Sequence, residues 1–178
     1  KHMIDLNKMF KPDSVAVIGA SNTPGKVGYI IVDNLINDGF DGEIYPVNPK
    51  GGEILCKTAY ANIKDVPGKV DLAIITIPSV FVNTAVKECG EVGVENMVVI
   101  TAGFKEVGEE GAKLEAELTA LGKEYGINII GPNSLGITDS HTPLNGSFSQ
   151  MMPPTGNIAF ISQSGAMMVA IIDWSVTS

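Results

Sequence analysis

The stretch from Ser14 to Gly28 constrains the fold most, because a strand, a turn and a helix start follow one another within it. Residues 15–18 form an apolar run typical of a buried strand, residues 19–25 are mostly small, and a helical apolar pattern continues from Tyr29. Backbone N–H groups at a helix start attract anions, and glycines in the turn allow a ligand to approach closely. The stretch therefore predicts a phosphate site. The alternative is a plain connection between strand and helix.

Four further apolar runs have the length of strands, and helical patterns separate them. The runs cover residues 43–47, 70–77, 96–101 and 127–130. The helical patterns cover about 26–38, 79–90 and 109–125, with Ser79 as the expected N-cap of the second helix and Gly126 as the stop of the third. Residues 63–66 are predicted to form one helical turn.

Continuous apolar strands that alternate with helices indicate a parallel sheet covered on both faces. The predicted fold class is therefore α/β, a Rossmann-like doubly wound sheet. Ligands of such sheets bind beyond the carboxyl ends of the strands. The turns that follow the predicted strands are therefore expected to converge on one site.

The sequence changes character after residue 137. Residues 138–156 are polar and rich in Pro, Gly, Ser and Met, which predicts a linker. Residues 157–178 repeat the order of strand, small-residue turn and helix. They are predicted to be the first strand–helix unit of a second, incomplete α/β domain, after a ligand-binding domain at 4–137.

Composition excludes several classes of function. The net charge of −8 argues against nucleic acid as a partner, and the longest apolar runs are too short to cross a membrane. Cys56 and Cys89 have neither metal-ligand spacing nor the density of a disulfide framework, so a reducing cytoplasm is expected. No catalytic residue and no metal site are predicted.

The end of the second predicted strand bears on the choice of ligand. Asn48, Pro49 and Lys50 stand where an NAD-binding domain has an acidic residue for the ribose, and the first turn lacks the Gly-x-Gly-x-x-Gly spacing. A lysine at this place favours an additional phosphate on the adenosine. NADP and coenzyme A (CoA) both carry one.

Six short motifs together resemble a known family. They lie at residues 17–21, 24–28, 45–49, 100–104, 130–133 and 162–165. In order and register they resemble the CoA-binding domain of ADP-forming acetyl-CoA synthetases, relatives of the succinyl-CoA synthetase alpha subunit. The resemblance implies the reversible reaction of acyl-CoA, ADP and phosphate to acid, CoA and ATP. It also implies a phosphohistidine relay in the full enzyme, and it identifies the second domain as a flavodoxin-like ligase domain.

The resemblance also implies roles for individual residues. Residues 24–28 would hold the CoA pyrophosphate, Lys50 would lie near the nucleotide phosphate, and Pro132 and Asn133 would lie near the thiol. Thr101 and Ala102 would contact the pantetheine or adenosine portion. The complete set of predicted contacts is Gly19, Ala20, Ser21, Pro24, Gly25, Lys26, Val27, Gly28, Asn48, Pro49, Lys50, Ile77, Pro78, Ser79, Thr101, Ala102, Gly103, Pro132 and Asn133.

The chain departs from the family pattern in two ways. Ser134 stands where the family usually has cysteine, and the phosphorylated histidine of the family belongs to the part of the second domain that this chain lacks. His141 lies in the predicted linker and is assigned no catalytic role. Glu106, Glu109 and Glu110 are expected to be a solvated helix start, since acidic residues favour that end of the dipole.

The predicted function is the CoA-binding portion of an ADP-forming acyl-CoA synthetase, which alone binds CoA without turnover. ADP or ATP with Mg and an ATP-grasp region, fused or as a beta subunit, belong to the full enzyme. Two alternatives remain open. One is a non-catalytic CoA-responsive regulatory module, and the other is an NADP-binding oxidoreductase domain.

Overall fold

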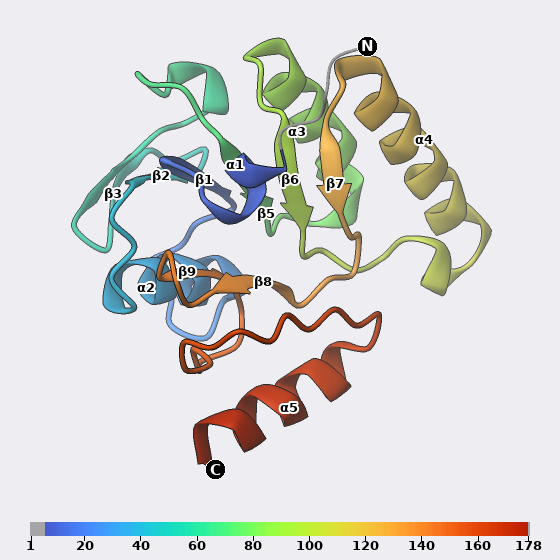
Figure 1. The fold of residues 1–178 in the computed structure, drawn as a ribbon. Coiled ribbons are helices and arrows are strands. Elements are labelled where there is room, and N and C mark those ends of the chain that lie inside the picture. Colours follow the sequence, from blue (N-terminus) through green and yellow to red (C-terminus); the bar gives the residue numbers. More distant parts are fainter. Residues whose placement is uncertain (1–5, 178) are drawn as a thin grey trace.

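A five-stranded parallel sheet forms the centre of the computed structural model, which describes residues 6–177 (Figure 1). The strand order is β2-β1-β5-β6-β7, and every neighbouring pair is parallel. The strands are β1 (Ser14–Ile18), β2 (Glu43–Val47), β5 (Leu72–Ile75), β6 (Asn96–Val99) and β7 (Asn128–Ile130). The chain builds outward in opposite directions from β1 and β5, so the fold is the doubly wound, Rossmann-like sheet that the sequence predicts.

Helices cover both faces of the sheet. Helix α2 (Val27–Asn37) lies on one face, and α3 (Ser79–Glu91) and α4 (Glu109–Tyr125) lie together on the other (Figure 1). A short α1 (Asn7–Phe10) precedes the first strand and buries Met9. The cover on both faces explains why the strands are continuous apolar runs.

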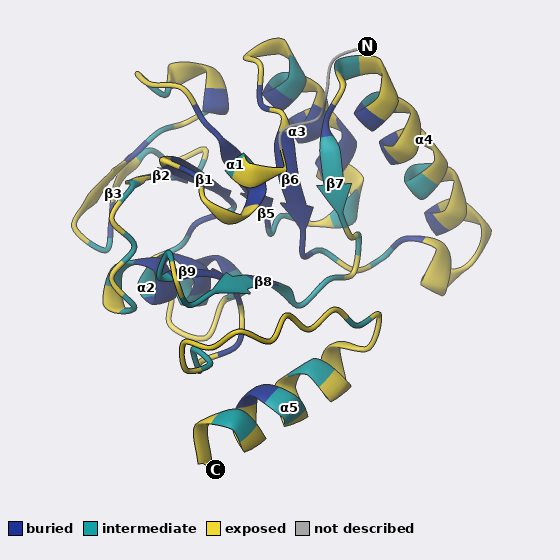
Figure 2. Ribbon diagram, in the orientation of Figure 1, coloured by how far each residue is buried: buried dark blue, intermediate teal, exposed yellow. Residues whose placement is uncertain are grey.

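Strand β1 shows how one apolar run serves two cores. Val15 and Val17 pack toward α2, whereas Ala16 and Ile18 pack toward α3 and α4. All four residues are buried, as are β5 and β6 (Figure 2). Successive side chains of a strand point to opposite faces, so both faces bury apolar area.

Several predicted element ends agree with the structure. Gly126 ends α4 in the left-handed conformation with φ +69°, which costs glycine little. Residues 63–66 include the predicted helical turn as the 3-10 helix η1 (Ile63–Asp65). A second 3-10 helix, η2 (Lys105–Val107), precedes α4. The expectation for Ser79 was wrong: Pro78 occupies the N-cap, and Ser79 is the first helical residue without a capping side-chain bond.

Two antiparallel hairpins were not predicted. The first, β3 (Gly52–Ile54) with β4 (Lys57–Ala59), follows the carboxyl end of β2. The second, β8 (Gly136–Asp139) with β9 (Leu144–Ser147), packs on α2 and buries Leu144 completely. Most of this second hairpin falls within the segment expected to be a linker. The division of the chain into domains stays a prediction.

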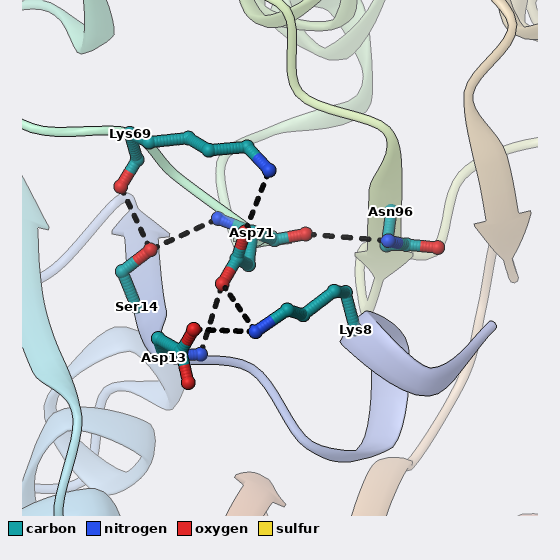
Figure 3. Close-up of polar contacts among 6 residues, drawn as sticks. All are labelled: Lys8, Asp13, Ser14, Lys69, Asp71 and Asn96. Atoms are coloured by element: carbon teal, nitrogen blue, oxygen red, sulfur yellow. Dashed lines mark hydrogen bonds and ion pairs between the residues drawn. The ribbon is translucent and has the colours of Figure 1, made fainter. Parts of the chain in front are cut away.

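A polar cluster joins α1 to the amino ends of the strands (Figure 3). The carboxylate of Asp71 accepts a hydrogen bond from the backbone N–H of Asp13 at 2.9 Å, and it lies 3.1 Å from Lys69 Nζ and 3.6 Å from Lys8 Nζ. Ser14 Oγ donates to the carbonyl of Lys69 and accepts from the backbone N–H of Asp71. This cluster lies at the edge of the sheet opposite the predicted ligand site.

The last helix, α5 (Gly165–Thr177), forms as expected, but the strand predicted before it does not. Residues 157–161 are exposed and pair with no strand of the described chain. A lone strand has no ladder partner, so an apolar run alone does not produce one. On α5, Ile172 is buried while Trp174 is 68% exposed, and Figure 2 shows the helix largely exposed.

Among residues 6–177, no helix is long and apolar enough to span a membrane.

Candidate functional site at the carboxyl edge of the sheet

The segments that follow four of the five parallel strands line one cavity of about 780 Å³. Because the strands are parallel, their carboxyl ends meet at one edge of the sheet, and the cavity lies at this edge. The predicted contact residues that line it are Val27, Ile77, Pro78, Thr101, Ala102 and Asn133. The segment after β2 carries Lys50 and does not line this cavity.

The turn between β1 and α2 depends on glycine for three separate reasons. Gly19 has φ +96°, and a Cβ there would lie 2.5 Å from Thr76 Oγ1. A Cβ on Gly28 would overlap the carbonyl oxygen of Gly19, so this glycine lets α2 approach β1 closely. Gly25 has φ +83° and faces open space. Gly28 therefore serves packing, while Gly25 leaves room on the outer side of the turn.

Of the helices that begin at this edge, α2 and α3 have neither a side-chain cap nor an acidic first turn. Neither Lys26 before α2 nor Pro78 before α3 gives a capping side-chain bond, and neither helix has an acidic residue in its first turn. The first N–H groups of a helix need a partner from outside the helix. An anion could supply it at either start, with the helix dipole in its favour.

Two exposed lysines lie on the segments around this edge. Within residues 6–177, neither Lys26 nor Lys50 takes part in an ion pair. The side chain of Asn48 donates to the carbonyl of Ala20 at 2.8 Å and accepts from the backbone N–H of Lys50 at 2.9 Å. Asn48 therefore joins the end of β2 to the first turn and fixes the backbone that carries Lys50.

The loop after β6 contains an exposed carboxylate with a backbone partner that the sequence did not indicate. Glu109 and Glu110 are exposed in the first turn of α4, as expected, whereas Glu106 is exposed but lies in η2. Glu106 accepts the backbone N–H of Gly103 at 2.6 Å. Hydrogen bonds from Gly103 and neighbouring backbone N–H groups hold the pKa of Glu106 below its ordinary value. The N–H of Gly103 is thus already used inside the loop. Thr101 Oγ1 donates to the carbonyl of Ile77 at 2.7 Å and links the ends of β5 and β6.

The loop after β7 separates two neighbouring predicted residues. Asn133 has φ +55° and lines the main cavity, and its backbone N–H donates to the carbonyl of Thr101 at 2.9 Å. Pro132 instead lines a second cavity of about 530 Å³ between α4 and β7. Ser134, which stands at the position of the family cysteine, lines the main cavity, and its Oγ accepts the backbone N–H of Gly136.

The remaining walls of the main cavity come from segments that the sequence analysis did not assign to the site. Leu135 and Phe148 border it from the two ends of the β8–β9 hairpin region, and the first turns of α5 border it through Gly165, Ala166 and Val169. Their apolar character gave no signal of a site, because isolated apolar residues are common on surfaces.

A Rossmann-like sheet with uncapped helix starts around a cavity at its carboxyl edge defines the class of nucleotide-binding domains. A family model described as CoA binding domain matches residues 13–140. The chain therefore belongs to this CoA-binding domain family.

Several of the similar proteins are named ADP-forming ligases. Acetate–CoA ligase [ADP-forming] I of Archaeoglobus fulgidus is 49% identical over 170 residues, which cover 96% of this chain and 24% of the ligase. The alpha subunit of acetate–CoA ligase [ADP-forming] I of Pyrococcus furiosus is 44% identical over 97% of this chain and 38% of the subunit. The chain thus spans between about a quarter and two fifths of the length of these relatives.

A solved structure shares the fold closely. The dinucleotide-forming acetyl-coenzyme A synthetase 1 of Ca. Korarchaeum cryptofilum, in complex with phosphate and ADP, has a TM-score of 0.93 and 43% identity. The match covers 98% of this chain and 37% of the synthetase. These comparisons bear out the resemblance that the sequence motifs carry.

Proposed function

We propose that this chain is the CoA-binding portion of an ADP-forming acyl-CoA synthetase and that it binds CoA at the carboxyl edge of the sheet. The observation that carries the proposal is the cavity shared by the segments after β1, β5, β6 and β7, beside two helix starts without caps. The pyrophosphate would lie against residues 24–28, and Lys50 would face the 3′-phosphate of the adenosine. The pantetheine would run along Thr101 and Ala102 toward Asn133.

Calorimetric titration with four ligands tests this proposal. We expect CoA to bind most tightly, dephospho-CoA to bind more weakly, and NAD to bind least. NADP carries an additional phosphate as well, and the Asn48, Pro49 and Lys50 segment favours it on the same ground. Tighter binding of NADP than of CoA would contradict the proposal and favour an NADP-binding oxidoreductase domain.

The complete reaction requires parts beyond this chain. We propose that ADP or ATP with Mg is handled by an ATP-grasp region, fused or as a beta subunit, and that the phosphorylated histidine belongs to the rest of the second domain. His141 Nε2 lies 2.8 Å from the carbonyl of Gly156, in keeping with a role in the β8–β9 loop, and His2 lies outside the described residues. The free thiols of Cys56 and Cys89 support a reducing compartment such as the cytoplasm.

An activity assay separates the proposed fragment from a complete enzyme. The purified chain should form no ATP from acetyl-CoA, ADP and phosphate. ATP formation by the chain alone would contradict the proposal. A non-catalytic CoA-responsive module would also bind CoA, but it would give no ATP formation when the remaining parts of the relatives' architecture are supplied.

A further inference from the structure

The turn of the β3–β4 hairpin has an unusual backbone. Leu55 and Cys56 form the two-residue turn, and both have positive φ, at +47° and +62°. Such turns normally carry Asn and Gly, because other side chains are strained in the left-handed region. Residues held in this region persist only where surrounding contacts hold them. A surrounding contact is therefore expected to hold Leu55 and Cys56 in this conformation.

The side chain of Asn22 supplies that contact. Its Oδ1 accepts the backbone N–H of Leu55 at 3.0 Å, and its Nδ2 donates to the carbonyl of Glu53 at 2.7 Å. Asn22 lies in the middle of the turn between β1 and α2, more than thirty residues from the hairpin. One amide therefore joins the proposed phosphate-binding turn to the hairpin tip through two directional bonds.

The hairpin itself is attached to the sheet. Ile54 and Ala59 are buried, and the backbone of Tyr60 bonds to Asn48 and Pro46 at 2.9 Å each. The tip at residues 55–56 is thus carried on a fixed base. A bond from this tip to Asn22 restrains the first turn from its outer side, while Asn48 restrains it from the end of β2.

We propose that Asn22 is a positioning residue for the ligand: it fastens residues 21–26 to the β3–β4 hairpin and so holds the turn in its ligand-receiving shape before the ligand arrives. The inference rests on the proposed function, since it concerns the turn that would receive the CoA pyrophosphate. A binding loop that is already ordered loses less conformational entropy on binding, so affinity rises without a new contact. Asn22 need not touch CoA to act in this way.

The affinity of an Asn22→Ala variant tests the proposal. We expect about tenfold weaker binding of both CoA and dephospho-CoA, on the scale of two lost side-chain hydrogen bonds. Both ligands should weaken equally, because both carry the pyrophosphate. A loss confined to CoA would overturn the proposal, because Asn22 would then act on the 3′-phosphate. Unchanged affinity for both would overturn it too and would leave the proposed function standing.

Asn62→Ala is the matched control. Asn62 also accepts a backbone N–H through its side chain, from Lys64 at 2.9 Å, and its own N–H bonds to Asp65. It caps η1 and makes no contact with the first turn among its hydrogen bonds. We expect a lower melting temperature for this variant with unchanged CoA affinity. If Asn22 had only a structural role, Asn22→Ala would likewise lower the melting temperature and leave the CoA affinity unchanged.

Hydrogen exchange of the Leu55 amide gives a second readout that requires no variant. This N–H bonds to Asn22, so it reports how firmly the turn holds the hairpin tip. If turn and hairpin are coupled, saturating CoA should slow its exchange about fivefold or more, since ordering one side of the bond orders the other. Unchanged exchange at saturating CoA would overturn the proposal. If CoA does not bind the unaltered chain, both the proposed function and the proposed role of Asn22 are overturned.

Discussion

Gly28 in the first turn of α2 lies against the carbonyl oxygen of Gly19 at the end of β1, with no room for a side chain between them. Gly25, only three residues earlier, faces open space. The two glycines of one turn therefore serve different purposes, and substitution should separate them.

Gly28→Ala should lower stability. The new methyl group would meet backbone atoms of Gly19 and Ala20, which cannot rotate away, so α2 must move off β1. We expect a loss of about 1–3 kcal/mol, as for overpacked cores, measured from urea unfolding midpoints. An unchanged midpoint would mean that the helix shifts without cost.

Gly25→Val should affect the ligand more than Gly28→Ala does. A Cβ here has no protein atom within 4 Å, so a side chain would start in the open space proposed for phosphate. We expect at least about tenfold weaker CoA binding in calorimetry. The positive φ should cost about 1–2 kcal/mol of stability as well. Normal CoA binding by a folded Gly25→Val variant would show that the pyrophosphate does not lie against this turn.

Lys50→Ala should distinguish CoA from dephospho-CoA. Lys50 is exposed, and its backbone is fixed by Asn48. Loss of a charge-assisted hydrogen bond should weaken CoA binding by about 1–3 kcal/mol and leave dephospho-CoA nearly unchanged. Titrations with the two ligands measure the difference. Equal weakening of both would show that Lys50 acts on something other than the 3′-phosphate.

Asp71→Asn should remove a stabilisation that depends on pH. Burial opposes ionisation of Asp71, but hydrogen bonds from the Asp13 N–H and Lys69 outweigh it and hold the pKa of the carboxyl below its ordinary value of 3.8. A lowered pKa stabilises the folded chain above the pKa of the unfolded chain, and this contribution is lost as the pH falls through the folded value.

Urea unfolding of the unaltered chain and of the Asp71→Asn variant between about pH 3 and pH 7 measures this effect. At neutral pH the variant should be less stable by about 1–3 kcal/mol, the range for hydrogen bonds to a charged group. The difference should shrink below the ordinary pKa of 3.8. A difference that stays constant into acid would mean that the Asp71 charge contributes nothing.

Cys56→Gly should stabilise the chain. Cys56 is exposed with φ +62°, a conformation that glycine adopts without the cost paid by a side chain. We expect a gain of about 1 kcal/mol in thermal or urea unfolding. Cys89→Gly is the control and should destabilise, because Cys89 is fully buried within α3. A loss of stability in Cys56→Gly would show that the thiol makes a useful contact.

The parallel sheet could be predicted from the sequence because its signal is local. Five apolar runs end in turns of small residues, and burial on both faces permits no polar alternation. The approximate bounds of α2, α3 and α4 followed from helical periodicity, with Gly126 as a stop. The convergence of four turns on one cavity followed from parallel topology alone, without knowledge of any side-chain contact.

The two hairpins could not be predicted in this way. The β3–β4 strands have three residues each, and the turn at Leu55 and Cys56 lacks the usual Asn and Gly. In the second hairpin, Asn145 and Ser147 are buried with their polar groups bonded inside the protein, so a polar sequence resembled a linker. The bond from the Gly103 N–H to Glu106 was not predicted, because the sequence does not reveal which backbone N–H a carboxylate reaches.

Amide side chains attach the end of β9 and the segment that follows it to α2. Asn34 Nδ2 donates to the carbonyls of Ser147 and Ser149 at 3.0 and 2.7 Å, and Asn145 Nδ2 donates to Asp38 at 2.8 Å. These hydrogen bonds fix the register of this joint between β9 and α2. A shift of β9 by one residue along α2 would leave buried amides unpaired, at a cost of about 1–3 kcal/mol each.

Helix α2 therefore sets the direction in which the chain leaves β9 toward α5. The same helix begins at the proposed phosphate turn. Residues 152–164, which contain no helix or strand, lead from this joint to α5, and the first turns of α5 border the cavity. The amide hydrogen bonds between α2 and β9 therefore link the helix at the proposed phosphate turn to the opposite wall of the same cavity.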